Sequence, residues 1–149
     1  MVIYDPLLGM IEVAMAMIEI LEWSERFKLG HKRIDSDHQK LIALINQLSD
    51  AMTKRVGKEA CSGVLQELVS YFQTHFAMEE DLMARHNYSQ SAAHKAEHVQ
   101  FVKQVEELQA KFETGSVTLS ISLLNFLRNW LANHILMTDK ALVAALPSE

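Results

Sequence analysis

Two histidines stand four residues apart in the segment HKAEH, at positions 94 and 98. Because an α-helix makes one turn in about 3.6 residues, His94 and His98 share one face of a helix. Zinc proteases use paired histidines at this spacing, but they need a glutamate directly after the first histidine as the general base. Lys95 holds that place here and the glutamate is Glu97, so the segment does not fit a zinc protease.

Long helices are expected to position these histidines. The chain has only two prolines, Pro6 and Pro147, so its interior lacks the residue that most strongly breaks helices. Apolar residues recur at spacings of three and four in four segments, which is typical of amphipathic helices. These segments predict helices over residues 36–54, 58–86, 90–113 and 118–144.

The connections between these segments are short, and short connections join antiparallel neighbours. The sequence therefore predicts an all-α fold, an antiparallel up-down-up-down four-helix bundle with an additional apolar N-terminal segment. Gly57 and Gly115 are expected to end helices. The expected N-caps are Asp35 or Ser36 for the first helix and Ser89 or Ser91 for the third.

Histidines and carboxylates occupy places on the apolar stripes where leucine would be expected. They are His38 on the first helix, His75 and Glu79 on the second, His94 and His98 on the third, and His134 and Asp139 on the fourth. In an antiparallel bundle the start of one helix lies beside the end of the next, so all seven side chains should meet at one end. Buried imidazoles and carboxylates are costly unless something pairs them, and a metal would do so.

Seven donors exceed the four ligands of a structural zinc site, and a mixture of imidazoles and carboxylates suits two iron ions. Two octahedral ions have twelve coordination positions. Five imidazole nitrogens, two bridging carboxylates and a bridging oxide or hydroxide fill eleven of them, which leaves one position for a small ligand. One spacing is awkward, because His134 and Asp139 lie about 140° apart around an ideal helix. We expect a wide lumen or a π-type bulge near residues 134–139, since such bulges favour functional sites.

The chain resembles the hemerythrin family, specifically the single-domain bacteriohemerythrins. After Trp23, the matching segments are GHKRIDSDHQKL, HFAMEEDLM, HKAEH and NWLANHILMTD. The resemblance implies a non-haem di-iron centre that binds O2 reversibly. It further implies that His94, His98 and His134 bind one iron and that His38 and His75 bind the other. Glu79 and Asp139 would bridge the pair, and O2 would take the open position on the iron with two histidines.

Three apolar residues are expected beside this centre. Leu131 precedes His134 by three residues and should face the open position, where the family places an apolar residue; it is equally expected as a core leucine. Phe76 and Trp130 are expected to pack near the metals, as core residues rather than as a gate.

The resemblance and the residues favour O2 binding for transport, storage, delivery or sensing, with no catalytic residues. The alternative is a di-iron enzyme acting on O2, peroxide or nitric oxide. Di-iron oxidases of the ferritin-like class use more carboxylates than histidines. The two carboxylates predicted here supply less negative charge to stabilise high-valent iron, which favours binding. An iron store or a structural metal bundle is a third class, and the open position argues against it.

The N-terminal segment is predicted to be a separate extension, with residues 1–22 outside the di-iron bundle of residues 23–149. Its apolar stretch at 7–21 is short for a membrane span and is interrupted by two glutamates. It is expected either to pack on the bundle or to act in docking or self-association. No basic residue precedes it, so we expect no signal peptide. The single cysteine, Cys61, fits a reducing compartment, and we expect a cytoplasmic location. The formal net charge of -5 argues against nucleic acid as a partner.

Overall fold

The computed structural model describes residues 21–54, 58–113 and 117–148, and the regular structure in these ranges is helical. The elements are the 3-10 helix η1 (Glu25–Phe27), the α-helices α2 (Lys32–Thr53), α3 (Lys58–Arg85), α4 (Ser91–Phe112) and α5 (Val117–Asn133), the π-helix η2 (His134–Asp139) and the α-helix α6 (Lys140–Ala145). The predicted all-α class is confirmed.

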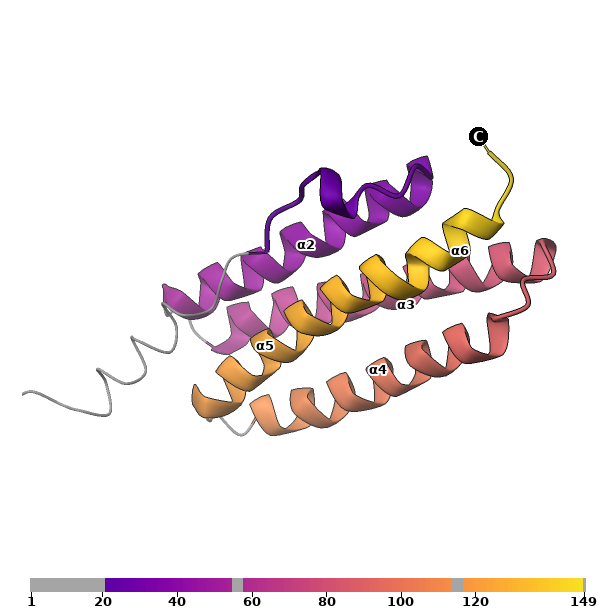
Figure 1. The fold of residues 1–149 in the computed structure, drawn as a ribbon. Helices are drawn as coiled ribbons and strands as arrows, with labels where there is room; N and C mark the ends of the chain where they lie inside the picture. Colours follow the sequence, from indigo (N-terminus) through magenta and orange to yellow (C-terminus); the bar gives the residue numbers. More distant parts are fainter. Residues whose placement is uncertain (1–20, 55–57, 114–116, 149) are drawn as a thin grey trace, which may run out of the picture.

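The long helices run alternately in opposite directions, as Figure 1 shows. Helix α2 packs against α3, α3 against α4, α4 against α5, and α5 returns to α2, which closes a four-helix bundle. Helices α5, η2 and α6 follow one another as a single rod in Figure 1, so together they form the fourth member of the bundle. The predicted up-down-up-down topology is confirmed.

The core is built from the apolar stripes that the sequence predicts. On α2, Leu41, Ile45 and Leu48 are spaced by four and three residues, and all are buried. At the centre, the ring of Phe101 lies 4.4 Å from that of Phe72 and 4.2 Å from that of Trp130, measured between centroids. These rings come from α3, α4 and α5, so one aromatic cluster joins three helices.

Helix α2 begins four residues earlier than predicted. Its N-cap is His31, whose Nδ1 accepts a hydrogen bond from the backbone N–H of Ile34 at 3.2 Å. The predicted caps Asp35 and Ser36 are therefore wrong. N-caps are predicted from Ser, Thr, Asp and Asn, whose short side chains carry an oxygen acceptor. A histidine that accepts from the same backbone N–H is therefore not predicted.

Asp35 instead holds the loop that leads into α2. It is 8% exposed, and its two carboxylate oxygens accept from the backbone N–H groups of Leu29 and Gly30 at 2.9 and 3.0 Å. Gly30 has a φ of 96°, a conformation that favours glycine. The loop and the first turn of α2 are thus fixed to each other.

The start of α4 also differs from its predicted cap. The N-cap is Gln90, with no hydrogen bond from its side chain, so the predictions of Ser89 and Ser91 are wrong. The hydroxyl of Ser91 donates instead to the carbonyl of Tyr88 at 2.7 Å, which closes the turn between α3 and α4. Gly57 and Gly115 lie outside the described residues.

The part of the chain before α2 lies against the bundle where it is described. The carbonyl of Leu21 accepts from the side-chain amide of Asn46 at 2.8 Å, and the Trp23 ring stacks on that of Phe27. Residues 1–20 are outside the described residues, so the boundary at residue 23 and the role of residues 7–21 stay predictions. Within the described ranges, every helix is too short or too polar to cross a membrane.

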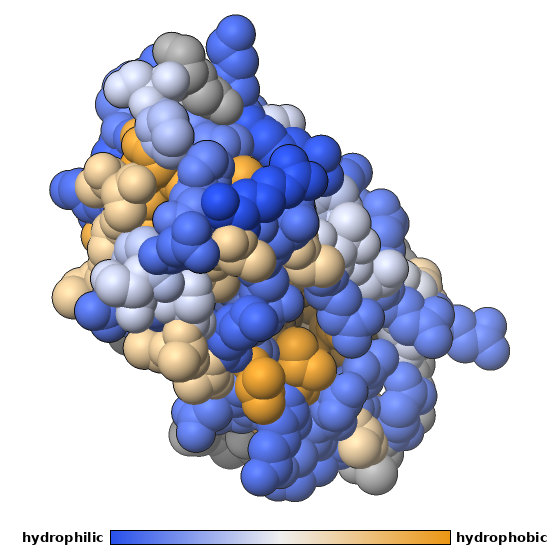
Figure 2. Space-filling model, turned by 90° about the vertical axis from the view of Figure 1, so that its right-hand side faces the viewer, coloured by the Kyte–Doolittle hydropathy of each residue, from blue (hydrophilic) through white to orange (hydrophobic). Residues whose placement is uncertain are grey.

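Figure 2 looks onto the end of the bundle at which α2 and α4 begin and α3 ends. Hydrophilic residues cover most of this face, and the apolar residues on it form smaller patches between them. The seven polar residues predicted to meet lie beneath this end of the molecule.

Candidate metal centre

Seven polar side chains are buried together between the helices. They are His38 on α2, His75 and Glu79 on α3, His94 and His98 on α4, and His134 and Asp139 at the two ends of η2. None is more than 3% exposed. The structure thus brings all the predicted ligand residues to one place.

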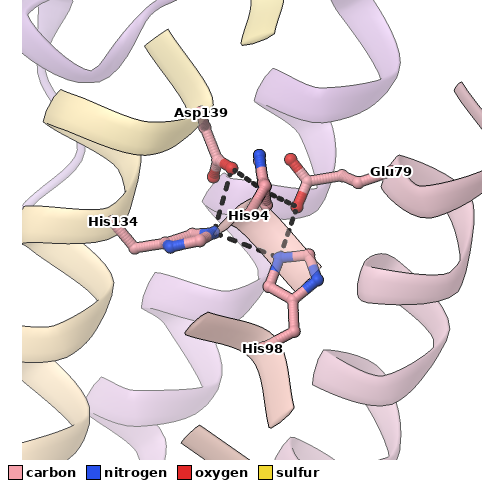
Figure 3. A group of neighbouring side chains, drawn as sticks. All are labelled: Glu79, His94, His98, His134 and Asp139. Carbon is pink, nitrogen blue, oxygen red and sulfur yellow. Dashed lines mark hydrogen bonds and ion pairs between the residues drawn. The ribbon is translucent and has the colours of Figure 1, made fainter. Parts of the chain in front are cut away.

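Their nitrogen and oxygen atoms form two groups, and within each group the atoms lie within 4.8 Å of one another. The first group, drawn in Figure 3, is Glu79, His94, His98, His134 and Asp139. The second is His38, His75, Glu79 and Asp139. The two carboxylates belong to both groups, so they lie between a set of three histidines and a set of two.

Asp139 shows this position between the two groups most directly. One of its oxygens, Oδ2, lies 2.8 Å from Nε2 of His38, which belongs to the second group. The other, Oδ1, lies 3.2 Å from Nε2 of His94 and 3.1 Å from Nε2 of His134, in the first group. A carboxylate with one oxygen on each side is placed to bind two cations at once.

The hydrogen bonding of the cluster is incomplete without a further group. Among the described residues, ten buried side-chain atoms have no hydrogen-bond partner, and they belong to His38, His75, Glu79, His94, His98 and Asp139. Nε2 of His98 and Nε2 of His134 also face each other at 3.2 Å. Unpaired buried polar atoms are costly, and a cation bound by these lone pairs would remove the cost. The donor set therefore fits metal ions.

The π-helix η2 explains how His134 and Asp139 both reach the centre. The backbone N–H of Lys140 bonds to the carbonyl of Ile135, five residues earlier, as a π-helix requires. This wider turn brings residues five apart toward the same side. The irregularity predicted near residues 134–139 is confirmed.

Aromatic rings flank the group of three histidines. The Phe76 ring stacks on His98 at 3.8 Å with 10° between the planes, and the Trp130 ring stacks on His134 at 4.3 Å with 15°. Leu131, one turn before His134, is 1% exposed and belongs to the main core. The Phe76 and Trp130 rings thus form an aromatic wall beside two of the three histidines. That Leu131 faces the open position stays a prediction.

Two carboxylates outside the seven residues hold imidazoles of the cluster. Nδ1 of His75 lies 2.8 Å from Oδ2 of Asp37, and Nδ1 of His134 lies 2.7 Å from Oε2 of Glu97. Since a carboxylate only accepts, each Nδ1 carries the proton and donates. The hydroxyl of Thr138 donates to the same oxygen of Glu97 at 2.8 Å, which ties η2 to α4.

Sequence reasoning missed both carboxylates. Asp37 lies beside His38 but off its three-four stripe, and nothing in the spacing shows that it would meet His75 on another helix. Glu97 attracts attention only because it is misplaced for a zinc protease. Its position between His94 and His98 was the one indication in the sequence that it lies near the cluster. Its partner, His134, is on a different helix, so the sequence does not show the pair.

The carboxylates also hold protons on the imidazoles. Burial lowers the pKa of His75, but the nearby carboxylates of Asp37 and Glu79 outweigh it and raise that pKa to about 10. Burial likewise lowers the pKa of His94, while Asp139 and Glu79 raise it to about 9. Burial and the charge of Asp139 raise the pKa of Glu79, but three imidazoles bring it down to about 2. A metal that binds here must therefore displace protons.

The fold and this cluster define a four-helix-bundle protein with a candidate cation site made of histidines and acidic residues. The family profile described as Hemerythrin HHE cation binding domain matches residues 29–146. The chain is 37% identical over 122 residues to a bacteriohemerythrin of Stenotrophomonas maltophilia, covering 82% of this chain and 78% of that protein. It is 38% identical over 128 residues to a bacteriohemerythrin of Pseudomonas aeruginosa, covering 85% and 81%.

A bacteriohemerythrin of Methylococcus capsulatus is more distant, at 34% identity over 110 residues, with 71% of this chain and 80% of that protein covered. The matched region contains the whole of the cluster, from His38 to Asp139. The chain belongs to the hemerythrin family.

Proposed function

We propose that this protein binds O2 reversibly at a non-haem di-iron centre. One observation carries the proposal: the cluster divides into three and two histidines around the shared carboxylates Glu79 and Asp139. That is the ligand division which the family resemblance implies. The relatives named bacteriohemerythrin support the same function.

The seven buried residues would bind the two irons as follows. His94, His98 and His134 would hold one iron, and His38 and His75 the other. Glu79 and Asp139 would bridge the two, with an oxide or hydroxide as a further bridge. The iron pair, when bound, supplies the electrons that make O2 binding both tight and reversible.

The surrounding residues would favour binding over oxidation chemistry. In the described part of the chain, the two metal-ligand groups contain only two carboxylates against five histidines. That set offers little negative charge to stabilise high-valent iron. The Phe76 and Trp130 rings stack on His98 and His134 and would help to exclude water from that side of the centre.

The test is a visible spectrum of the reduced, iron-loaded protein under argon, then in air, and then under argon again. We expect a band that appears with O2 and disappears when O2 is removed. No band in air, together with steady consumption of O2, peroxide or nitric oxide, would contradict the proposal and favour an enzyme. The cytoplasmic location stays a prediction.

Replacing Leu131 by alanine is expected to shorten the lifetime of the oxygenated protein. Leu131 is buried one turn before His134, and the family resemblance implies that it faces the open position, so the smaller side chain would open space there. Water and protons entering that space would promote irreversible oxidation of the irons. The O2-dependent band should decay several-fold faster, while the iron content stays the same.

Leu127→Ala is the matched control, because Leu127 lies one turn further from the centre on α5 and is also fully buried. Both substitutions should destabilise the fold by a similar amount, about 2–5 kcal/mol. Equal band lifetimes in the two variants would show that Leu131 is only a core residue.

A further inference from the structure

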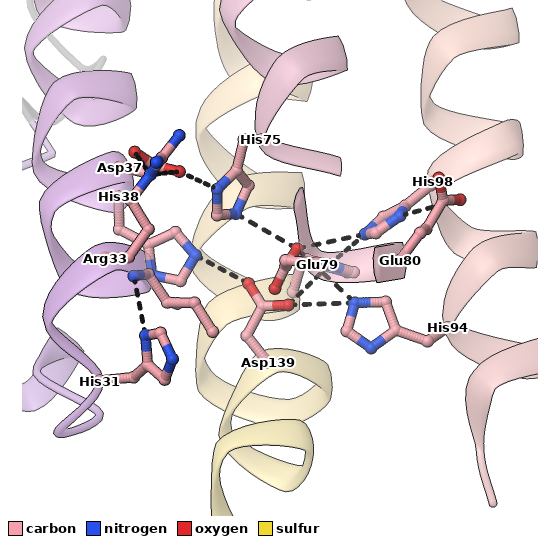
Figure 4. A network of polar contacts seen from close by, with 12 residues as sticks. His31, Arg33, Asp37, His38, His75, Glu79, Glu80, His94, His98 and Asp139 are labelled. Atoms are coloured by element: carbon pink, nitrogen blue, oxygen red, sulfur yellow. Dashed lines mark hydrogen bonds and ion pairs between the residues drawn. The ribbon is translucent and has the colours of Figure 1, made fainter. Parts of the chain in front are cut away.

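Asp37 is a buried carboxylate that neither metal-ligand group includes. It is 3% exposed, and both of its oxygens are engaged. Oδ2 lies 2.8 Å from Nδ1 of His75, and Oδ1 accepts from the hydroxyl of Tyr71 at 3.0 Å. Nε of Arg33 donates to both oxygens at 3.1 and 3.2 Å. Figure 4 shows Asp37 reaching from α2 to the far side of the His75 ring, away from Glu79.

This arrangement fixes the His75 ring in the form that a metal needs. A neutral imidazole has one protonated nitrogen and one lone pair, and Asp37 holds the proton on Nδ1. When a metal displaces the second proton, the lone pair is on Nε2, which lies 3.2 Å from Oε1 of Glu79, on the side of the centre. Tyr71 and Arg33 hold the carboxylate itself, so the ring has little freedom to turn.

The charge of Asp37 also acts through the ring. A carboxylate that accepts the imidazole N–H makes the other nitrogen a stronger donor to a metal. A stronger donor favours the ferric over the ferrous ion. Because Asp37 is buried, water screens this effect little.

We propose that Asp37 is a positioning residue that orients His75 and lowers the reduction potential of the iron held by His38 and His75. This inference rests on the proposed di-iron function and names a residue that tunes it. The group of three histidines has a counterpart in Glu97, which bonds to His134. The side chain of Glu97 is 47% exposed, so solvent weakens its influence. Burial therefore favours a stronger effect on the iron with two histidines, and the Arg33 guanidinium offsets part of the Asp37 charge.

Two substitutions separate the position of the ring from the charge. Asp37→Asn keeps an oxygen that can accept from His75 but removes the negative charge. We expect it to retain iron and to raise the reduction potential by about 59 mV, which is a tenfold change in the ferric-to-ferrous ratio. Asp37→Ala removes the acceptor as well, and we expect iron to bind about 10–100-fold more weakly.

Asp35→Asn is the matched control. Asp35 is buried on the same helix, but its carboxylate bonds to the backbone of Leu29 and Gly30 and not to the cluster. This variant should have the reduction potential and the iron affinity of the unmodified protein. Glu97→Gln should shift the potential by less than Asp37→Asn does.

The measurements are iron per chain, the iron dissociation constant and a redox titration of each full-length variant. If Asp37→Asn matches Asp35→Asn in both potential and affinity, the inference is wrong. If Asp37→Ala fails to fold, the reduction potential of Asp37→Asn still tests the inference.

The unmodified protein is cycled between argon and air in parallel. A missing O2-dependent band there refutes the proposed function, whereas a normal band with unshifted Asp37 variants refutes only the tuning role.

Discussion

Replacing Glu79 by glutamine should abolish binding of the iron pair while the helix bundle remains folded. Glu79 belongs to both ligand groups and is fully buried, so its two oxygens are placed to serve both ions. A carboxamide has one acceptor oxygen and no charge, and it cannot bridge two cations. We expect the iron content to fall from two per chain to one or fewer, and the O2-dependent band to be lost.

Glu67→Gln is the matched control for this change. Glu67 is on the same helix, its side chain is 57% exposed, and it forms a weak ion pair with Lys40 at 3.9 Å. This variant should keep two irons and the O2-dependent band. Circular dichroism of both variants checks that the helices persist. A Glu79→Gln protein that still binds two irons would show that the shared carboxylate is not the bridge.

Removing iron should lower the melting temperature, and the loss should be larger at pH 8.5 than at pH 6. A ligand present at about 1,000 times its dissociation constant stabilises a fold by about 4 kcal/mol. For a chain of this size, that corresponds to a change of about 10 °C. Differential scanning fluorimetry of iron-loaded and chelator-treated protein measures it.

The pH dependence follows from the raised pKa values of two histidines. In the metal-free fold the pKa of His75 is about 10 and that of His94 about 9, whereas an ordinary histidine has a pKa of 6.5. Their protonated forms stabilise the metal-free fold fully below pH 6.5, and this contribution is lost as the pH rises toward 9–10. The iron-loaded fold holds neutral imidazoles and lacks this contribution at either pH.

The difference between the two forms should therefore widen as the pH rises through this window. Glu79, with a pKa of about 2, is ionised throughout and does not alter the comparison. A melting-temperature difference that shrinks between pH 6 and pH 8.5 would mean that metal binding does not displace protons from these histidines.

The bundle and the meeting of the seven side chains could be predicted because both depend on patterns within single helices. The three-four spacing of residues such as Leu41, Ile45 and Leu48 identifies the buried face. The order of the helices then sets which ends meet. The π-helix was predictable for a related reason: in a regular α-helix, residues five apart such as His134 and Asp139 do not face the same side.

The residues that sequence reasoning missed depend on pairs formed between helices. Asp37 meets His75 across the contact of α2 with α3, and Glu97 meets His134 across the contact of α4 with η2. No spacing along the chain encodes either pair. The cap formed by His31 was missed because the rules for caps weigh common residue types, and an imidazole at that position serves the same backbone N–H.

X-ray absorption at the iron edge of the loaded protein tests the central claim most directly. If Glu79 and Asp139 bridge a metal pair, the spectrum should show nitrogen and oxygen neighbours and a second iron within about 3.5–4 Å. Chemical analysis of the same sample should give two irons per chain. One iron per chain, or two irons without a mutual scattering contribution, would contradict a di-iron centre held by these seven residues.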